Sequence, residues 1–273
     1  MKIIDAWMQH PTPGFLGQPI FESVLRWTKQ SAASEIPLAA MIESMDQAGV
    51  ALGLVTAWYG PQGALISNDE VAGFVSEYPK RLVGIASVDL SQPMNAVREL
   101  RRAVKDLGFK GLRMLPWLWG LPPDDRRYYP LYAECVELEI PFCTQVGHTG
   151  PLMSSEPGRP IPYLEHVALE FPELKIVAGH LGAPWVGEVL SLAHKFPNFY
   201  IDTSAYKLSR LPKEFVEYMR LSGSKKVMFG TNYPMLTASA CLEGLEELKL
   251  GPEAEARFLS ENAARVFGVS ASG

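Results

Sequence analysis

The stretch Lys175-Ile-Val-Ala-Gly-His180-Leu-Gly182 is an apolar run that ends in a histidine and a glycine turn. Its length and its branched residues are typical of a buried strand, and Gly179 and Gly182 let the backbone turn closely around the histidine. A strand with a polar side chain at its C-terminal end is what a (β/α)8 barrel supplies at its active face. The stretch therefore predicts a barrel strand that delivers His180 to a site.

A second stretch, Pro141-Phe-Cys-Thr-Gln-Val-Gly-His148-Thr-Gly150, repeats the pattern. It runs apolar residues into Gly-His and then into a loop rich in glycine and proline. If both stretches are consecutive parallel strands, their C-terminal ends meet at one face of the barrel. A lone histidine is commonly a hydrogen-bonded structural residue, but two at successive strand ends favour a functional role. We therefore expect His148 and His180 to converge on one pocket.

Strand and helix patterns alternate eight times along the chain, as in a TIM barrel of the α/β class. A doubly wound open sheet has the same alternation, but no glycine-rich phosphate-binding motif opens a helix in this sequence. One such barrel takes about 250 residues, and the chain has 273. We therefore predict a single barrel domain over residues 1–273. The predicted strands cover residues 1–10, 53–57, 82–88, 109–115, 141–148, 175–180, 198–204 and 226–232.

Residues 14–37 are too apolar for a solvated loop, because they include Phe15, Leu16, Phe21, Leu25 and Trp27. They follow the first predicted strand and precede the first regular helix pattern. We expect this insertion to form a lid that carries a short helix.

Composition and charge favour a small-molecule protein. Hydrophobic residues make up 47% of the chain, the formal net charge is −5, and no run of Lys and Arg suggests a surface for nucleic acid or anionic lipid. Three cysteines without Cys-x-x-Cys spacing argue against a disulfide framework and a structural zinc site. The sequence has neither a signal segment nor an apolar run of about 18 residues, the length that a membrane span requires. We expect a cytoplasmic protein with reduced thiols.

Further polar or aromatic side chains belong to predicted strand ends. Arg113 either pairs with Asp202 as part of the architecture or grips a substrate carboxylate, a use that suits its planar guanidinium. Asp202 itself either contacts the substrate or orients a histidine. The candidate substrate-binding residues at strand ends are Trp7, Gln9, His10, Arg113, Asp202 and Asn232.

Four stretches of the sequence carry a family resemblance. They are Ile176-Val-Ala-Gly-His-Leu-Gly, Asn198-Phe-Tyr-Ile-Asp-Thr-Ser, Phe229-Gly-Thr-Asn-Tyr-Pro and Glu261-Asn-Ala-Ala-Arg-Val-Phe-Gly. Together they resemble the amidohydrolase-related family, the branch of the amidohydrolase superfamily that contains aminocarboxymuconate semialdehyde decarboxylase, resorcylate-type decarboxylases and pyrone dicarboxylate lactonase. The resemblance extends over residues 3–268 and implies a distorted TIM barrel and a homodimer. It also implies that His148 matches a metal-ligand histidine and that His180 matches a histidine with acid–base or electrophilic roles.

The chain departs from this family pattern at three of the four usual metal-ligand positions. Members usually begin with Asp-x-His-x-His, whereas Trp7 and Gln9 stand here in place of the two histidines. Strand eight usually ends with an aspartate, and here the matching residue is Asn232. Tryptophan cannot bind zinc and amides bind it poorly, so we expect no metal cofactor. The alternative is a one-residue shift that brings His10 to join His148 in a partial site for a divalent metal such as zinc.

Three functions compete at this point. The first is hydrolysis of an activated, lactone-like bond in a small carboxylated substrate, with His180 as acid and base, His148 as electrophilic partner and Arg113 as carboxylate clamp. Gln9 and Asn232 would then supply neutral hydrogen bonds. The second is a decarboxylase or other lyase acting on a small aromatic or unsaturated acid. The third is a barrel that has lost catalysis and only binds a ligand.

Overall fold

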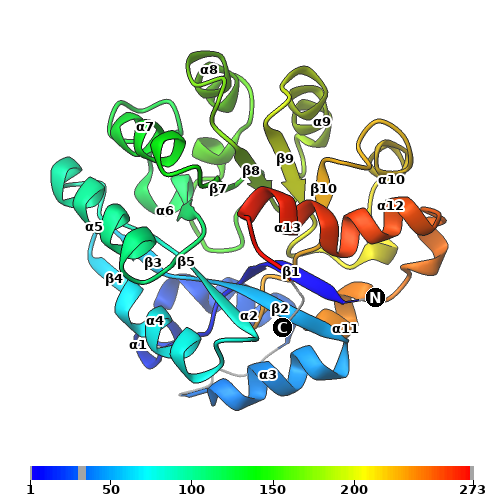
Figure 1. Ribbon diagram of the computed structural model, residues 1–273, viewed down its shortest axis with the longest axis horizontal. Helices are drawn as coiled ribbons and strands as arrows, with labels where there is room; N and C mark the ends of the chain where they lie inside the picture. The colour runs from blue at the N-terminus through cyan, green and yellow to red at the C-terminus, as the bar shows by residue number, and fades with distance from the viewer. Residues whose placement is uncertain (1, 30–34, 271–273) are drawn as a thin grey trace.

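The computed structural model describes residues 2–29 and 35–270, which form an α/β barrel (Figure 1). Within these residues, the eight strands of the barrel wall pair in parallel. The barrel strands are β1 (Ile3–Met8), β2 (Val50–Thr56), β5 (Leu82–Ile85), β6 (Leu112–Met114), β7 (Phe142–Gln145), β8 (Ile176–Gly179), β9 (Phe199–Asp202) and β10 (Val227–Met228). The predicted fold is confirmed.

The barrel wall is divided into two hydrogen-bonded sheets, with strand orders β1-β2-β5 and β10-β9-β8-β7-β6. Single parallel bridges from Ala86 to Leu112 and from Met8 to Tyr233 join the two sheets. The backbone N–H of Ala6 also donates to the carbonyl of Phe229 at 2.9 Å. The Met8 bridge and the Ala6 hydrogen bond close the ring between the first and last strands, and the Ala86 bridge closes it between β5 and β6, so the barrel is a distorted one.

A short antiparallel hairpin follows β2 and was not predicted. It consists of β3 (Trp58–Gly60) and β4 (Gly63–Ile66). The signal in the sequence is weak, because the two apolar runs are short and are separated only by Pro61 and Gln62. The hairpin brings Trp58 to the C-terminal end of the barrel, where it contributes to the pocket described below.

Helices surround the barrel wall (Figure 1). Helix α4 (Asn68–Glu77) begins at a pair of reciprocal hydrogen bonds. The Ser67 hydroxyl accepts from the Glu70 N–H at 3.2 Å, and the Glu70 carboxylate accepts from the Ser67 N–H at 2.7 Å. This capping box places the cap at Ser67. The regular α-helices are α3 (Leu38–Gln47), α4 (Asn68–Glu77), α5 (Pro93–Lys105), α6 (Pro116–Trp119), α7 (Tyr129–Glu137), α8 (Tyr163–Glu170), α9 (Val186–Lys195), α10 (Lys213–Arg220), α11 (Ala238–Leu242), α12 (Pro252–Ala256) and α13 (Asn262–Phe267).

The segment between β1 and α3 contains α1 (Pro13–Leu16), the 3-10 turn η1 (Pro19–Phe21) and α2 (Glu22–Thr28). The predicted helical content of this insertion is therefore present, in two short helices rather than one. Residues 30–34 of the predicted lid lie outside the described residues. The action of the segment as a lid stays a prediction.

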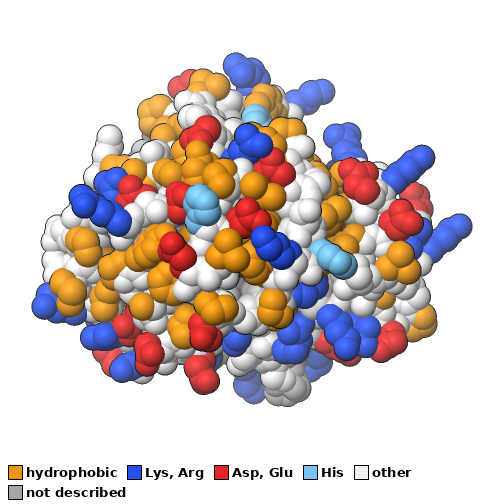
Figure 2. Space-filling view, turned by 90° about the horizontal axis from the view of Figure 1, so that it is seen from above, with side chains coloured by type: hydrophobic (Ala, Val, Ile, Leu, Met, Phe, Trp, Pro, Cys, Tyr) orange, Lys and Arg blue, Asp and Glu red, His pale blue; other side chains and the backbone are white. Residues whose placement is uncertain are grey.

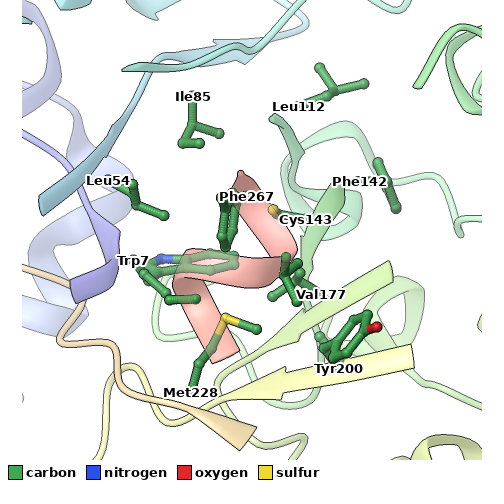
Figure 3. Close-up of a cluster of buried hydrophobic side chains, with 14 of the residues drawn as sticks. Trp7, Leu54, Ile85, Leu112, Phe142, Cys143, Val177, Tyr200, Met228 and Phe267 are labelled. Atoms are coloured by element: carbon green, nitrogen blue, oxygen red, sulfur yellow. The ribbon is translucent and has the colours of Figure 1, made fainter. Parts of the chain in front are cut away.

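Apolar side chains from the strands fill the barrel interior, together with Trp7 from β1 and Phe267 from α13 (Figure 3). Phe267 lies close to Gly111, which directly precedes β6, so α13 covers the N-terminal end of the barrel. The strands are buried on both faces, as parallel barrel strands are. The opposite, C-terminal end remains available for a pocket. All three cysteines are buried and free.

Candidate active site

A cavity of about 590 Å³ opens at the C-terminal ends of the strands. The described residues that line it include no Lys, Arg, Asp or Glu. Most of its walls are aromatic or aliphatic, and three primary amides and two histidines interrupt them. The lining residues are Gln9, Phe15, Leu16, Phe21, Val24, Leu25, Trp27, Ile36, Trp58, Trp117, Gln145, His148, Gly150, Pro151, His180, Ala205, Tyr206, Asn232, Tyr233, Pro234, Met235 and Thr237.

His180 follows β8 and lines the cavity from a buried position, with 7% of its surface exposed. Burial, together with the smaller effect of the Arg113 charge, lowers the pKa of its imidazole to about 3. The ring is therefore neutral near pH 7. It packs against the edge of the Trp7 indole, with ring centroids 5.0 Å apart.

His180 has a hydrogen-bonded partner just after the next strand, β9. Its Nδ1 lies 2.6 Å from the hydroxyl oxygen of Ser204. The Ser204 hydroxyl donates in turn to Oδ1 of Asp202, and the Ser204 N–H donates to the same oxygen at 2.9 Å. Burial raises the pKa of Asp202 to about 6. The Asp202 carboxylate thus reaches the His180 ring through Ser204, which agrees with the idea that it orients a histidine.

The backbone is strained where three strands end at the cavity. His180 has φ +70°, Ala205 has φ +67° and Asn232 has φ +65°. A left-handed backbone is uncommon for residues other than glycine and persists only where surrounding structure holds it. Because all three residues line the cavity, the strain is concentrated at the candidate site.

His148 lines the same cavity as His180, from the loop after β7. Unlike His180 it is exposed, and its ring stacks on the indole of Trp27 with centroids 5.6 Å apart. Its carbonyl accepts a hydrogen bond from the amide of Gln145 at 3.2 Å. The structure thus brings the two predicted histidines to one pocket, one at its buried end and one at its exposed edge.

Gln9 and Asn232 also line the cavity, as expected of strand-end residues. The Gln9 amide nitrogen donates to Oδ1 of Asn232 at 3.0 Å and to the carbonyl of Tyr233. The two amides therefore bind each other across the junction of the first and last strands.

Arg113 and Trp7, both predicted to bind the substrate, do not line the cavity. Both are 1% exposed. The Arg113 guanidinium lies 3.6 Å above the Trp7 ring and donates to the carbonyl of Ala6 at 3.1 Å. The two side chains stack on each other in the barrel interior and therefore do not contribute to the cavity lining.

His10 and Asp202 are likewise absent from the lining. His10 is buried with its ring 4.8 Å from that of Phe74, and burial lowers its pKa to about 4. The predicted shift that would bring His10 beside His148 does not occur, because His10 packs against α4 instead. Asp202 is wholly buried behind Ser204, so its assignment as a substrate-binding residue is also corrected.

Several residues that line the cavity were not predicted to do so, above all Gln145 and the residues of the aromatic walls. Gln145 ends β7, and its Oε1 accepts from the indole N–H of Trp117 at 2.8 Å. The signal for Gln145 was its place at the end of a predicted strand. The walls formed by Phe15, Phe21 and Trp58 left no such signal, because they come from segments outside the barrel strands.

Substitution of Gly179 by alanine is expected to destabilise the fold by about 1–3 kcal/mol. A Cβ atom at Gly179 would overlap the Trp7 ring, which Arg113 and His180 hold in place. Gly73→Ala is the matched control, because no heavy atom lies within 4 Å of its added Cβ and it sits inside α4. That control is expected to gain about 0.5–1 kcal/mol. Urea unfolding of both variants measures the difference, and equal stabilities would contradict the packing argument.

The family model described as amidohydrolase matches residues 37–269 of the chain. The chain belongs to the amidohydrolase family. The predicted resemblance is confirmed. The chain is 25% identical to 2-amino-3-carboxymuconate-6-semialdehyde decarboxylase of Dictyostelium discoideum. This match covers 70% of the chain and 64% of the relative, so the chain spans less than two thirds of that relative. It is 24% identical to gamma-resorcylate decarboxylase of Rhodococcus jostii over 74% of the chain and 75% of the relative.

Among solved structures, an uncharacterized TIM-barrel protein from Bordetella bronchiseptica superimposes with a TM-score of 0.86. It is 29% identical, and the match covers 98% of this chain and 99% of that one. The same strand arrangement over nearly the whole chain supports the barrel assignment.

The prediction of no metal cofactor is contradicted by solved structures of this fold. A dihydroxybenzoic acid decarboxylase from Polaromonas, 18% identical with a TM-score of 0.74 over 98% of this chain and 97% of that one, holds bound manganese. The described residues of this chain do not fit the usual donor set, because they contain no group of three or more His, Cys, Asp or Glu placed to hold an ion. Trp7 is buried, and the amides of Gln9 and Asn232 bind each other. No catalytic step below is assigned to a metal.

The surface carries mixed charge. On the face drawn in Figure 2, acidic and basic side chains are interspersed among hydrophobic ones, without a continuous basic area. Among residues 2–29 and 35–270, no helix combines the length and the apolar character needed to cross a bilayer.

Proposed function

We propose that the chain is a carboxy-lyase that removes the carboxyl group of a small aromatic or unsaturated acid. The single observation that carries the proposal is the cavity itself: a neutral histidine lies at the buried end of a pocket whose described lining has no fixed charge. The names of the relatives from Dictyostelium and Rhodococcus, both decarboxylases, support the same reaction class. They favour it over the hydrolysis of a lactone-like bond, which was our first prediction.

The shape and chemistry of the walls suit a planar ring. Phe15, Phe21, Trp58, Trp117 and Tyr206 surround the cavity with aromatic surface. Each square ångström of apolar ligand surface removed from water stabilises the complex by about 25 cal/mol. A cavity of about 590 Å³ falls within the size range of small-ligand sites.

The described lining residues include no fixed cation, which favours loss of carbon dioxide. A carboxylate is strongly hydrated in water, and transfer into apolar surroundings without an ion-pair partner raises its free energy. As the carbon–carbon bond breaks, the negative charge spreads from the carboxylate into the ring or the unsaturated system. The apolar walls therefore penalise the substrate more than the transition state, which lowers the barrier.

His180 is the proposed acid and base. In an acid with a neighbouring hydroxyl group, its Nε2 takes the hydroxyl proton, and the resulting imidazolium gives that proton to the carbon bearing the carboxylate. The bond to the carboxylate then breaks, carbon dioxide leaves, and the bonding electrons restore the ring as a phenolate, which takes a proton from water. The sum consumes one proton per carbon dioxide released, and no oxidant or reductant is needed.

The polar groups near His180 are proposed to orient the substrate. With Arg113 buried beneath the cavity, recognition of the carboxylate falls to neutral donors such as the Gln145 amide and to the exposed His148. Gln9 and Asn232 are proposed to contact the substrate from the first and last strands.

The test is a panel of hydroxybenzoates, 5-carboxyvanillate and unsaturated dicarboxylic acids, each assayed for carbon dioxide release and for the decarboxylated product. Each assay is run with and without added manganese, the ion that the Polaromonas structure holds. Lactones form a parallel panel in which ring opening is measured. We expect release of carbon dioxide from at least one aromatic acid. Ring opening of lactones without any release from the acids would overturn the proposal.

A further inference from the structure

We propose that Ser204 positions His180. Its hydroxyl donates to Asp202 and accepts from Nδ1 of His180, which fixes the imidazole proton on Nδ1 and leaves Nε2 as the free acceptor. The catalytic consequence rests on the function proposed above. The state of the imidazole ring does not, because it can be measured without a substrate.

The direction of each hydrogen bond follows from what each group can donate. An ionised carboxylate only accepts, so the Ser204 hydroxyl must give its single proton to Oδ1 of Asp202. The serine oxygen then has only lone pairs left for the 2.6 Å contact with Nδ1 of His180. The imidazole must therefore donate from Nδ1. In a neutral histidine, a proton on Nδ1 leaves the lone pair on Nε2.

The surroundings hold this arrangement in place. Asp202 and Ser204 are both completely buried, so water does not compete for their hydrogen bonds. The Ser204 N–H donates to the same carboxylate oxygen at 2.9 Å, which keeps Oδ1 aimed at the hydroxyl. The Trp7 indole packs against the imidazole and restricts its rotation. A hydrogen bond in such low-dielectric surroundings is electrostatically stronger than one in water.

The arrangement also affects the proposed reaction. When Nε2 takes a proton, the imidazolium carries a positive charge close to the buried guanidinium of Arg113, which opposes it. The hydrogen bond to Ser204 connects that charge to the carboxylate of Asp202. Ser204 therefore makes His180 a better base without touching the substrate.

The first experiment records the ring nitrogens of His180 by long-range ¹H–¹⁵N correlation in protein labelled at histidine. The chain has five histidines, and the His180 signals are assigned by their loss in His180→Asn. We expect a protonated Nδ1 and an unprotonated Nε2 in the wild type at pH 7.5. Ser204→Ala should give the opposite state or a mixture, and Ser204→Thr should restore the wild-type pattern. A proton on Nε2 in the wild type, or an unchanged pattern in Ser204→Ala, would overturn the proposal.

Thr203→Val is the matched control. Thr203 is as buried as Ser204 and adjacent to it, and its hydroxyl has no hydrogen-bond partner among the described residues. Removal of this hydroxyl should leave the His180 nitrogens unchanged. A change as large as that in Ser204→Ala would mean that any disturbance of this strand end alters the ring, and would refute a specific role for Ser204.

The second experiment is kinetic and uses whichever acid releases carbon dioxide. Ser204→Ala is expected to lower kcat by about 10- to 100-fold, the range seen when a group that orients a ligand is removed. KM should stay within about twofold, because Ser204 is not part of the cavity lining. A rise in KM with unchanged kcat would place Ser204 in substrate binding instead. If no acid is turned over, the carboxy-lyase proposal fails, while the NMR experiment still judges the role of Ser204.

Discussion

Replacement of His180 by asparagine is expected to lower carbon dioxide release by about 10³-fold, within the range that general acid–base groups contribute. Asparagine tolerates the left-handed backbone that His180 adopts at φ +70°. Its side-chain nitrogen can stand in for Nδ1 and donate to Ser204. The variant therefore keeps the hydrogen bond and the backbone but lacks a group in the position of Nε2. Turnover number and melting temperature, measured on the same preparation, separate a loss of chemistry from a loss of fold.

His194→Asn is the control for this substitution. His194 is exposed on α9 and does not line the cavity. It should keep wild-type turnover and stability. Full activity in His180→Asn would remove His180 from the reaction, and the remaining histidine of the cavity, His148, would become the candidate base.

Replacement of Asp5 by alanine is expected to destabilise the fold by about 3 kcal/mol or more, since each buried donor left without an acceptor costs about 1–3 kcal/mol. The Asp5 carboxylate accepts from the N–H of Trp7 at 3.1 Å and from the N–H and hydroxyl of Thr231 at 3.0 and 2.6 Å. These bonds join β1 to the residues after β10, where the barrel ring closes between its first and last strands. Chemical denaturation measures the loss.

Asp46→Ala is the control, because Asp46 forms an ion pair with Arg81 at 2.7 Å while 60% exposed. An exposed pair contributes about 0–1 kcal/mol, so this variant should remain close to wild type. If Asp5→Ala were as stable as Asp46→Ala, the closure of the barrel would have to depend on other contacts.

We also expect the ionisation of Asp5 to make the stability of the fold depend on pH. Burial raises the pKa of Asp5 from 3.8 to about 7. The folded protein therefore binds this proton more tightly than the unfolded chain does, and its contribution to stability falls as pH rises from about 4 to about 7. Asp5→Asn cannot ionise and should lack this contribution. The free energy of unfolding of both proteins is measured at pH 5 and at pH 8. Between these two values, the wild type should lose more stability than Asp5→Asn does. Asp202 and His180 titrate in both proteins, so the difference isolates Asp5.

The prediction of no metal cofactor, which rested on departures from the family pattern, was wrong. Trp7, Gln9 and Asn232 do depart from a metal-binding pattern, and the described residues provide no complete donor set. A solved decarboxylase of this fold nevertheless holds manganese, so changed ligand positions are not evidence for a family without metal.

The barrel fold, and the position of two histidines at one pocket, could be predicted from the sequence. The alternation of short apolar runs with amphipathic helices is a local property, and strand ends in a barrel all point to one face. For that reason the sequence pattern alone assigns His148, His180, Gln9 and Asn232 to one cavity, and all four line it.

Which strand residues reach the cavity, and which side chains surround them, became known from the tertiary structure. Arg113 and Trp7 bind each other one layer below it, and Ser204 stands between Asp202 and His180. Depth along a strand and pairing between neighbouring strands set these positions, and neither is visible in a periodic pattern. The aromatic walls come from the segment after β1 and from the hairpin after β2, whose side chains meet the barrel only when the chain is folded.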